Sequence, residues 1–279
     1  MRIIKACDIT PKVKELCTSA NFELGEDMLD AFKKGLEREE SPAGRAVIEQ
    51  LIENARIAKE ERVPMCQDTG FAVFFVEMGR DLHVDGDIYD AINEGVRQGY
   101  EEGFLRKSIV SHPLSRVNTK DNTPAIIYID LVPGDKLKII FAPKGGGSEN
   151  MSSLKMLKPS DGIEGVKKFV VESVEKAGPN PCPPIIVGVG IGGTFEKSAW
   201  LAKKALLRHV GEKSAKPEDA ALEEELESLI GDLGIGPMGF GGRVTAFAVQ
   251  VETHPCHIAS LPVAVNIQCH AARHKEVLI

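Results

Sequence analysis

The sequence predicts an α+β protein, a single domain with a sheet core and an N-terminal helical layer. Apolar residues recur at three- and four-residue spacing over much of the first sixty residues, whereas β-rich apolar runs appear in the middle and near the end of the chain. Helices and strands alternate too irregularly to require a doubly wound parallel sheet. Since no internal repeat or low-complexity linker interrupts the 279 residues, we predict one domain over 1–279.

Three helices are predicted in the first hundred residues from the 3.6-residue period of their apolar positions. They cover 27–36, 42–57 and 88–100. The second has a clear start signal, because Ser41 is a good N-cap and Pro42 is tolerated in the first turn of a helix.

Strands are predicted where apolar residues run together or β-branched residues dominate. The run over 72–78, with Val and Phe, indicates a buried strand. The runs over 125–132 and 137–141 flank a Pro-Gly-Asp turn and predict a β-hairpin.

The second half of the chain continues this alternation. A buried strand, three helices and two terminal β-branched runs are expected: helices over 162–177, 194–209 and 218–230, and strands over 185–189, 243–251 and 257–267. A polar stretch before 218 looks like a surface turn and not a domain boundary.

Composition narrows the classes of function. The net charge of −7 argues against a nucleic-acid partner, which favours a basic face. No apolar run approaches the roughly 20 residues that cross a bilayer, so no membrane association is expected. The N-terminus becomes charged too soon for a signal peptide, so we expect a cytoplasmic protein with reduced thiols.

Three cysteines are the main candidates for chemistry. Cys66, Cys182 and Cys269 each lie in a short segment where Pro, Gly or polar residues suppress regular structure. Three thiolates converging from distant loops would bind an iron–sulfur cluster and leave one iron without a protein ligand, and such an iron is a Lewis acid. The alternative is that they are buried free cysteines of a cytosolic protein.

The other cysteines limit this hypothesis. Cys7 and Cys17 are expected to be buried small hydrophobic residues, and Cys256 competes as a third or fourth cluster ligand. No CxxC pair is present, which argues against a zinc ribbon, a thioredoxin site or a ferredoxin-type electron carrier.

Two glycine-rich motifs have competing interpretations. Residues 188–193 (GVGIGG) match a dinucleotide-binding turn, but no second strand ending in an acidic residue follows. Close packing of a strand against a helix is favoured there, and an anion site at Thr194 is a third interpretation. Residues 145–148 (GGGS) either expose N–H groups that bind a carboxylate or a cluster sulfide, or form a flexible hairpin exit.

Polar residues near the cysteines suit a small acidic substrate. Asp68 lies two positions after Cys66, and Arg106 can pair with a substrate carboxylate. His257 precedes Cys269 by twelve residues. Taken singly, each has an ordinary alternative: a capping aspartate, a surface arginine or a structural histidine.

Four motifs in their order along the chain resemble the class I fumarases, and closely the α subunit of the two-subunit form, shared with tartrate dehydratase. The resemblance covers nearly the whole chain, and it rests on PMCQDTG (64–70), KGGGSEN (144–150), GVGIGGT (188–194) and NIQCHA (266–271). It implies a 4Fe–4S cluster with one iron lacking a protein ligand, and Cys256 as a bystander. The cluster ligands implied are Cys66, Cys182 and Cys269, and the residues facing the substrate are Gln67, Asp68, Arg106, His257 and the backbone of Gly146.

The resemblance also implies a reaction and a partner. Fumarate would be hydrated reversibly to L-malate, with Asp68 and His257 as proton shuttles, while tartrate is the alternative substrate. Fused family members continue into a second domain, whereas this chain stops at Ile279. With Arg106 the only arginine placed on a dicarboxylate, we expect a separately encoded β subunit, in an α2β2 assembly. Two other classes remain: a nucleotide-binding oxidoreductase built on Gly188–Gly193, and an iron–sulfur redox or sensing protein.

Overall fold

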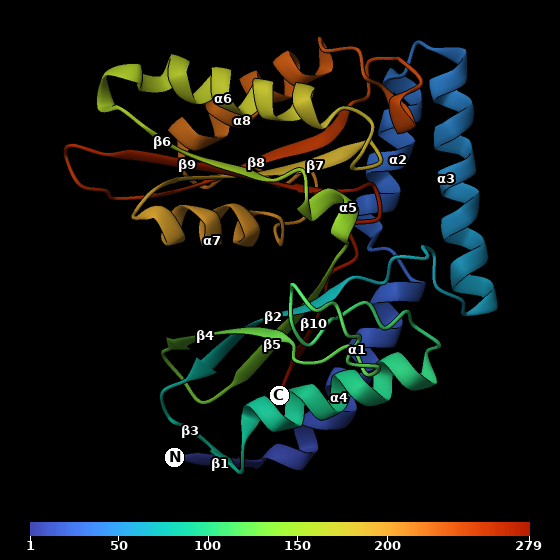
Figure 1. Cartoon of the computed structure of the whole chain (residues 1–279), viewed down its shortest axis with the longest axis vertical. Helices are drawn as coiled ribbons and strands as arrows, with labels where there is room; N and C mark the ends of the chain where they lie inside the picture. Colours follow the sequence, from blue (N-terminus) through green and yellow to red (C-terminus); the bar gives the residue numbers. More distant parts are fainter. The chain divides into compact units, whose positions relative to one another are not determined.

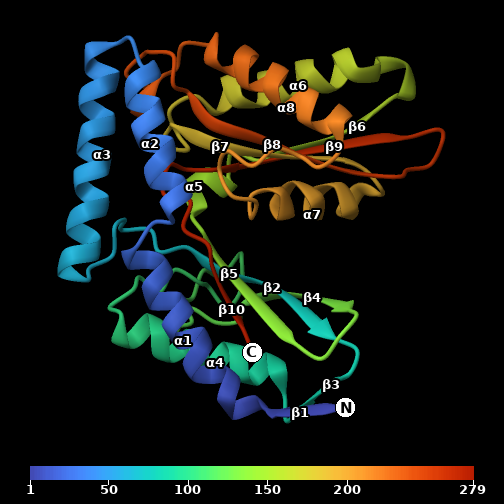
Figure 2. The same ribbon diagram turned by 180° about the vertical axis from the view of Figure 1, so that it is seen from behind.

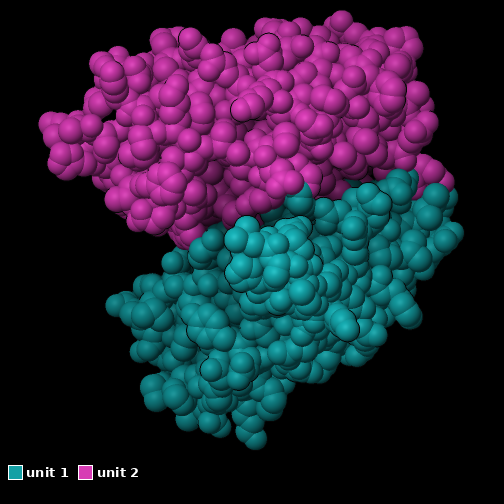
Figure 3. All heavy atoms as spheres, viewed as in Figure 1, with its two compact units in different colours: residues 1–25, 54–146, 273–279 teal, residues 26–53, 147–272 magenta.

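The computed structural model describes all 279 residues, and contacts divide them into two compact units. Unit 1 comprises residues 1–25, 54–146 and 273–279, and unit 2 comprises 26–53 and 147–272 (Figure 3). Each unit has its own sheet and its own hydrophobic core. This content of helices and mixed sheets confirms the predicted α+β class. No helix is both long enough and apolar enough to span a membrane.

Unit 1 is built on the four-stranded sheet β10-β5-β2-β4, with a two-stranded pair β1-β3. Helices α1 and α4 pack against each other (Figure 1). The elements of this unit are β1 (Arg2–Lys5), α1 (Ala6–Phe22), β2 (Phe71–Gly79), β3 (Leu82–Asp85), α4 (Ile88–Glu102), β4 (Ile126–Val132), β5 (Leu137–Lys144) and β10 (Lys275–Leu278).

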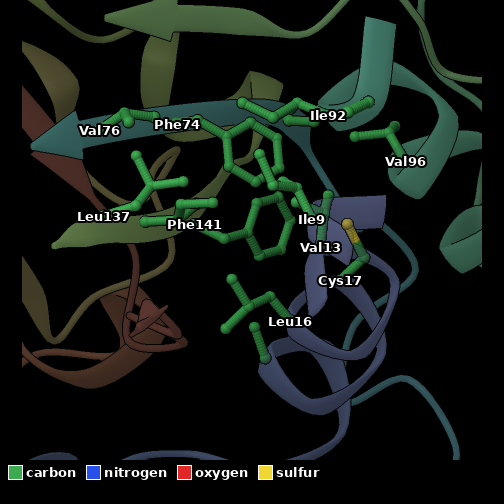
Figure 4. Close-up of a cluster of buried hydrophobic side chains, with 14 of the residues drawn as sticks. Ile9, Val13, Leu16, Cys17, Phe74, Val76, Ile92, Val96, Leu137 and Phe141 are labelled. Atoms are coloured by element: carbon green, nitrogen blue, oxygen red, sulfur yellow. The ribbon is translucent and has the colours of Figure 1, made fainter. Parts of the chain in front are cut away.

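Helices α1 and α4 approach closely because glycines on α4 face α1. A Cβ at Gly95 would lie 2.5 Å from the Cβ of Val13, and one at Gly99 would lie 2.7 Å from the Cβ of Cys17. The apolar side chains of both helices meet those of β2 and β5 in one buried cluster (Figure 4). The start of α4 is fixed by Asp87, whose carboxylate accepts hydrogen bonds from two N–H groups of the first turn.

The predicted hairpin between the runs at 125–132 and 137–141 is wrong. Both strands exist, but β2 lies between them, parallel to β4 and antiparallel to β5. Five consecutive residues of the nine-residue β2 are buried, and a strand this apolar is most stable with neighbours on both edges. The pattern of residues in two neighbouring runs does not reveal that a strand from about fifty residues earlier in the chain lies between them.

Unit 2 contains the sheet β6-β9-β7-β8, in which β7 runs parallel to β8 and antiparallel to β9. Helices α6 and α8 lie on one side of this sheet and α7 on the other (Figures 1 and 2). The elements are α2 (Glu26–Arg38), β6 (Ser153–Leu157), η1 (Pro159–Asp161), α6 (Gly162–Ala177), β7 (Ile185–Gly192), α7 (Phe195–Ala205), α8 (Pro217–Gly231), η2 (Pro237–Gly239), β8 (Ala246–His254) and β9 (Leu261–Gln268). Helices α3 (Pro42–Glu61) and α5 (Gly146–Glu149) each contain a boundary between the units.

The first five residues of the GVGIGG motif form the end of β7, and Gly188 and Gly190 contact α7 directly. A Cβ at Gly188 would lie 2.1 Å from the carbonyl oxygen of Ala202, and one at Gly190 would lie 2.1 Å from that of Ser198. No side chain fits at either position, since real Cβ contacts are never this short. The geometry supports the packing interpretation of this motif.

Candidate functional site

The segment from Cys66 to Gly70 connects α3 to β2 and is held by buried side chains of unit 1. The hydroxyl of Tyr100 lies 2.9 Å from the carbonyl oxygen of Thr69 and 3.1 Å from that of Gly70. Gly70 has φ +81°, and a Cβ there would meet the backbone nitrogen of Lys144 at 2.7 Å. Only glycine fits this turn, which sets the direction of the loop that carries Cys66.

Asp68 and Gly146, two predicted site residues 78 positions apart, are in direct contact. The carboxylate of Asp68 accepts a hydrogen bond from the N–H of Gly70 at 3.0 Å and another from the N–H of Gly146 at 2.7 Å. The glycine-rich segment therefore binds a carboxylate, as one interpretation of its sequence expected, and the carboxylate belongs to the chain itself. Asp68 is oriented by main-chain donors on both of its oxygens.

Arg106 lies on a loop attached to the same segment. Its backbone carbonyl accepts a hydrogen bond from the hydroxyl of Thr69 at 3.2 Å. Buried Asn122 accepts from the N–H of Ser108 at 2.8 Å and donates to the carbonyl of Gly70 at 3.2 Å, which ties the two loops together. The side chains of Arg106 and Gln67 are exposed.

Arg273 contacts the Cys66 loop and was not predicted. It is only 3% exposed, and its Nη2 donates to the backbone carbonyl of Asp68. Its Nε and Nη1 are buried without a hydrogen-bond partner. A buried cation behind this loop favours an anionic group at the loop. Arg273 follows Cys269 by four positions, and this closeness of a basic residue to a candidate ligand was the sequence signal that could have identified it.

Cys182 and Cys269 come from neighbouring segments of unit 2. Cys182 precedes β7, Cys269 follows β9, and the antiparallel register places Ile186 opposite Gln268. His270 bonds to the carbonyl of Cys182 through its ring Nδ1, at 3.0 Å, and through its backbone N–H, at 3.4 Å. Two of the three predicted cluster ligands are thus held together within one unit.

His257 and Cys256 lie in the loop between β8 and β9, at the other end of β9 from Cys269. Seven steps along this strand correspond to roughly 23 Å. Within unit 2 the structure therefore does not bring His257 next to Cys182 and Cys269. Cys256 is excluded as a fellow ligand of these two by the same separation, and its thiol donates to the carbonyl of Ser260 at 3.3 Å.

None of the six cysteines forms a disulfide, but their surroundings differ. Cys66, Cys182 and Cys269 are partly exposed. Cys17 is fully buried, as predicted, and burial raises the pKa of its thiol well above the usual range. The prediction for Cys7 is wrong: it lies in the first turn of α1 and is exposed.

No three His, Cys, Asp or Glu side chains are gathered so as to hold a single metal ion. The donor chemistry fits an iron–sulfur cluster nonetheless, because such clusters are held by cysteine thiolates. The partly exposed Cys66, Cys182 and Cys269 supply that donor type, and buried Arg273 supplies a cation beside the Cys66 loop.

Comparison with known proteins identifies relatives over nearly the whole chain. The sequence model described as Fumarate hydratase (Fumerase) matches residues 10–278. The putative L(+)-tartrate dehydratase subunit alpha of Methanocaldococcus jannaschii is 47% identical over 272 residues, which is 95% of each chain. The L(+)-tartrate dehydratase subunit alpha of Escherichia coli O157:H7 is 33% identical over 276 residues, or 97% of this chain and 90% of the relative.

Proposed function

Because the chain belongs to the fumarate hydratase (Fumerase) family, we propose that it is the cluster-carrying subunit of a hydro-lyase that reversibly hydrates fumarate to L-malate. The observation that carries this proposal is the pairing of the Cys182 and Cys269 loops by His270. L(+)-tartrate is the second candidate substrate, favoured by the names of the relatives in M. jannaschii and E. coli. L-malate and L(+)-tartrate are both four-carbon dicarboxylates with a hydroxyl group at C2.

Cys66, Cys182 and Cys269 would hold the 4Fe–4S cluster. When bound, the cluster supplies an iron without a protein ligand, whose Lewis acidity makes hydroxide a better leaving group. Loss of water from malate also requires removal of a proton from C3, and the charge that develops moves toward the distant carboxylate. A cation at that carboxylate stabilises the charge.

Arg106 and Gln67 would bind substrate carboxylates, since both side chains are exposed beside the Cys66 loop. Asp68 would move the proton of the C2 oxygen, because the N–H groups of Gly70 and Gly146 fix its carboxylate in one orientation. The Gly146 N–H faces Asp68, so its role toward substrate would act through that carboxylate.

His257 needs a different explanation. It lies roughly 23 Å along β9 from the Cys182–Cys269 pair, too far to act on a substrate at a cluster bound there by the same chain. We assign it a role in proton transfer only at a site completed by a second copy of the chain. An α2β2 assembly provides such a copy.

A separate β subunit would complete the site. The relatives in M. jannaschii and E. coli are both named as alpha subunits. Arg106 is the only arginine that we place on a substrate with two carboxylates, because Arg273 is buried and donates to the backbone of Asp68. The second carboxylate would therefore be bound by another polypeptide. We propose a cytoplasmic location, where thiols stay reduced, for a chain whose six cysteines form no disulfide.

The competing classes have less support. A dinucleotide would need the backbone of Gly188 and Gly190 to be open, but both positions are filled by α7. A redox carrier normally closes its cluster with a fourth cysteine, and Cys256 lies at the far end of β9.

Anaerobic iron–sulfur reconstitution followed by assays with L-malate and L(+)-tartrate tests the proposal, with and without the β-type partner. We expect dehydration only with the partner, and its loss in Cys182→Ser. Cys256→Ser is the matched control and should keep both cluster and activity. A chain that binds no iron overturns the cluster assignment, and dehydration by the chain alone overturns the need for a partner. Dehydration of L(+)-tartrate but not of L-malate would make tartrate the substrate in place of malate and fumarate.

A further inference from the structure

His270 joins two segments that are 88 residues apart in the sequence. Its ring nitrogen Nδ1 lies 3.0 Å from the carbonyl oxygen of Cys182, and its own backbone N–H lies 3.4 Å from the same atom. A carbonyl oxygen has two lone pairs and accepts both bonds. His270 is also the residue that follows Cys269, so one residue connects the two cysteine segments of unit 2.

The protonation of the ring follows from this contact. A carbonyl only accepts hydrogen bonds, so Nδ1 must carry a proton. The ring is oriented by the core, because it lies edge-on to Phe32 with 6.4 Å between ring centroids. Phe32 is fully buried and packs edge-on against Phe247 at 5.0 Å. The imidazole is therefore held from behind while its N–H reaches Cys182.

Cys182 needs such a contact because its backbone is strained. Its φ is +57°, in the left-handed region that residues with a Cβ avoid. Neighbouring bonds hold both sides of it: the N–H of Cys182 donates to Pro179 at 3.0 Å, and the carbonyl of Pro183 accepts from Met238 at 2.8 Å. The carbonyl of Cys182 itself is held by His270. Strained backbone persists only where surrounding contacts over-determine it, and it concentrates at functional sites.

We propose that His270 is a positioning residue for the iron–sulfur cluster, which keeps the thiols of Cys182 and Cys269 in the arrangement that the cluster requires. The inference rests on the proposed function, since it assumes that these two thiols are cluster ligands. His270 acts on Cys182 through a hydrogen bond to its backbone carbonyl, and on Cys269 because the two residues are adjacent in the chain. Residues that orient metal ligands typically change metal affinity by about 10–100-fold when they are removed.

The test compares two variants with a control. His270→Leu removes the donor, whereas His270→Asn places an amide N–H the same number of bonds from the backbone as Nδ1. His83→Leu, at an exposed position in β3 of unit 1, controls for loss of a histidine. The readouts are iron and sulfide bound per chain after anaerobic reconstitution, and the rate at which EDTA bleaches the visible absorption of the cluster. We expect bleaching about tenfold faster or more in His270→Leu, and within about threefold of wild type in His270→Asn and His83→Leu.

Hydrogen exchange of the iron-free chain tests the contact without the cluster. Peptides that contain Cys182 should exchange about fivefold faster in His270→Leu, which corresponds to the loss of one hydrogen bond, and near the wild-type rate in His270→Asn. Unchanged exchange and unchanged bleaching in His270→Leu would overturn the positioning role. Faster exchange with unchanged bleaching would also overturn it, because the contact would then serve the fold alone. If the wild-type chain takes up no iron while exchange responds as expected, the proposed function fails and the contact stands.

Discussion

Replacing Cys182 and Cys269 by glycine and by alanine should give opposite orders of stability at the two positions. Cys182 has φ +57°, whereas Cys269 does not have a positive φ. A residue with a Cβ costs about 1–2 kcal/mol in the left-handed region, and glycine avoids this cost. Glycine also loses about 0.5–1 kcal/mol more chain entropy than alanine on folding. The difference leaves Cys182→Gly more stable than Cys182→Ala by about 0.5–1 kcal/mol.

At Cys269 only the entropy term remains, so Cys269→Gly should be less stable than Cys269→Ala by about 0.5–1 kcal/mol. All four variants lack one thiol, so they are compared as iron-free chains in urea. The single tryptophan, Trp200, lies in α7 of unit 2, as do both cysteines, so its fluorescence reports on the unit that carries the change. Comparable m-values would show that the same surface is exposed on unfolding. The same order at both positions would refute the assignment of strain to Cys182.

Three further predictions concern packing, the Cys66 loop and thiol chemistry. Gly190→Ala should lower the free energy of unfolding by about 3 kcal/mol, because its Cβ would lie 2.1 Å from a backbone oxygen of α7. Gly231→Ala is the control, because its Cβ would lie 3.4 Å from the nearest backbone oxygen, and it should change the free energy of unfolding little. Equal losses of stability for the two variants in urea titrations would contradict the packing role of Gly190. Tyr100→Phe should cost about 1–2 kcal/mol, since buried carbonyls of the Cys66 loop lose their donor, and an unchanged thermal midpoint would argue against that. Iodoacetamide at pH 8 should label exposed Cys256 within minutes and Cys17 only after unfolding, because burial keeps the pKa of Cys17 high and its thiol protonated. Mass spectrometry identifies the labelled cysteines, and early labelling of Cys17 would contradict this expectation.

Helices and strands were predicted from the sequence where a single segment carries a clear apolar pattern. Helix α6 has the predicted bounds, α4 lies where periodicity placed it, and β2 and β7 lie where apolar runs indicated buried strands. The short edge strands β1, β3, β6 and β10 escaped prediction, since four or five residues carry too little periodicity. The division into two units was invisible as well, because two of its boundaries fall inside helices α3 and α5.

The candidate site, like the fold, could be predicted from the sequence only in part. Motif order pointed to Asp68 and Gly146, but their contact across 78 residues is a product of the sheet, in which β2 and β5 are antiparallel neighbours. His270 and Arg273 were missed because their roles lie in what they touch, the carbonyls of Cys182 and Asp68. The placement of His257 at the far end of β9 follows from strand direction, which sequence spacing does not give.

The order of segments in unit 1 has a consequence for biosynthesis. This unit begins with residue 1, yet its edge strand β10 consists of residues 275–278 and pairs with β5. Every residue assigned to unit 2 leaves the ribosome before β10 does. Domains generally fold from the N-terminus during synthesis, but here the unit that starts first is completed last. Until then β5 has one unpaired edge, an aggregation-prone surface, and a chaperone that binds nascent chains would find it there.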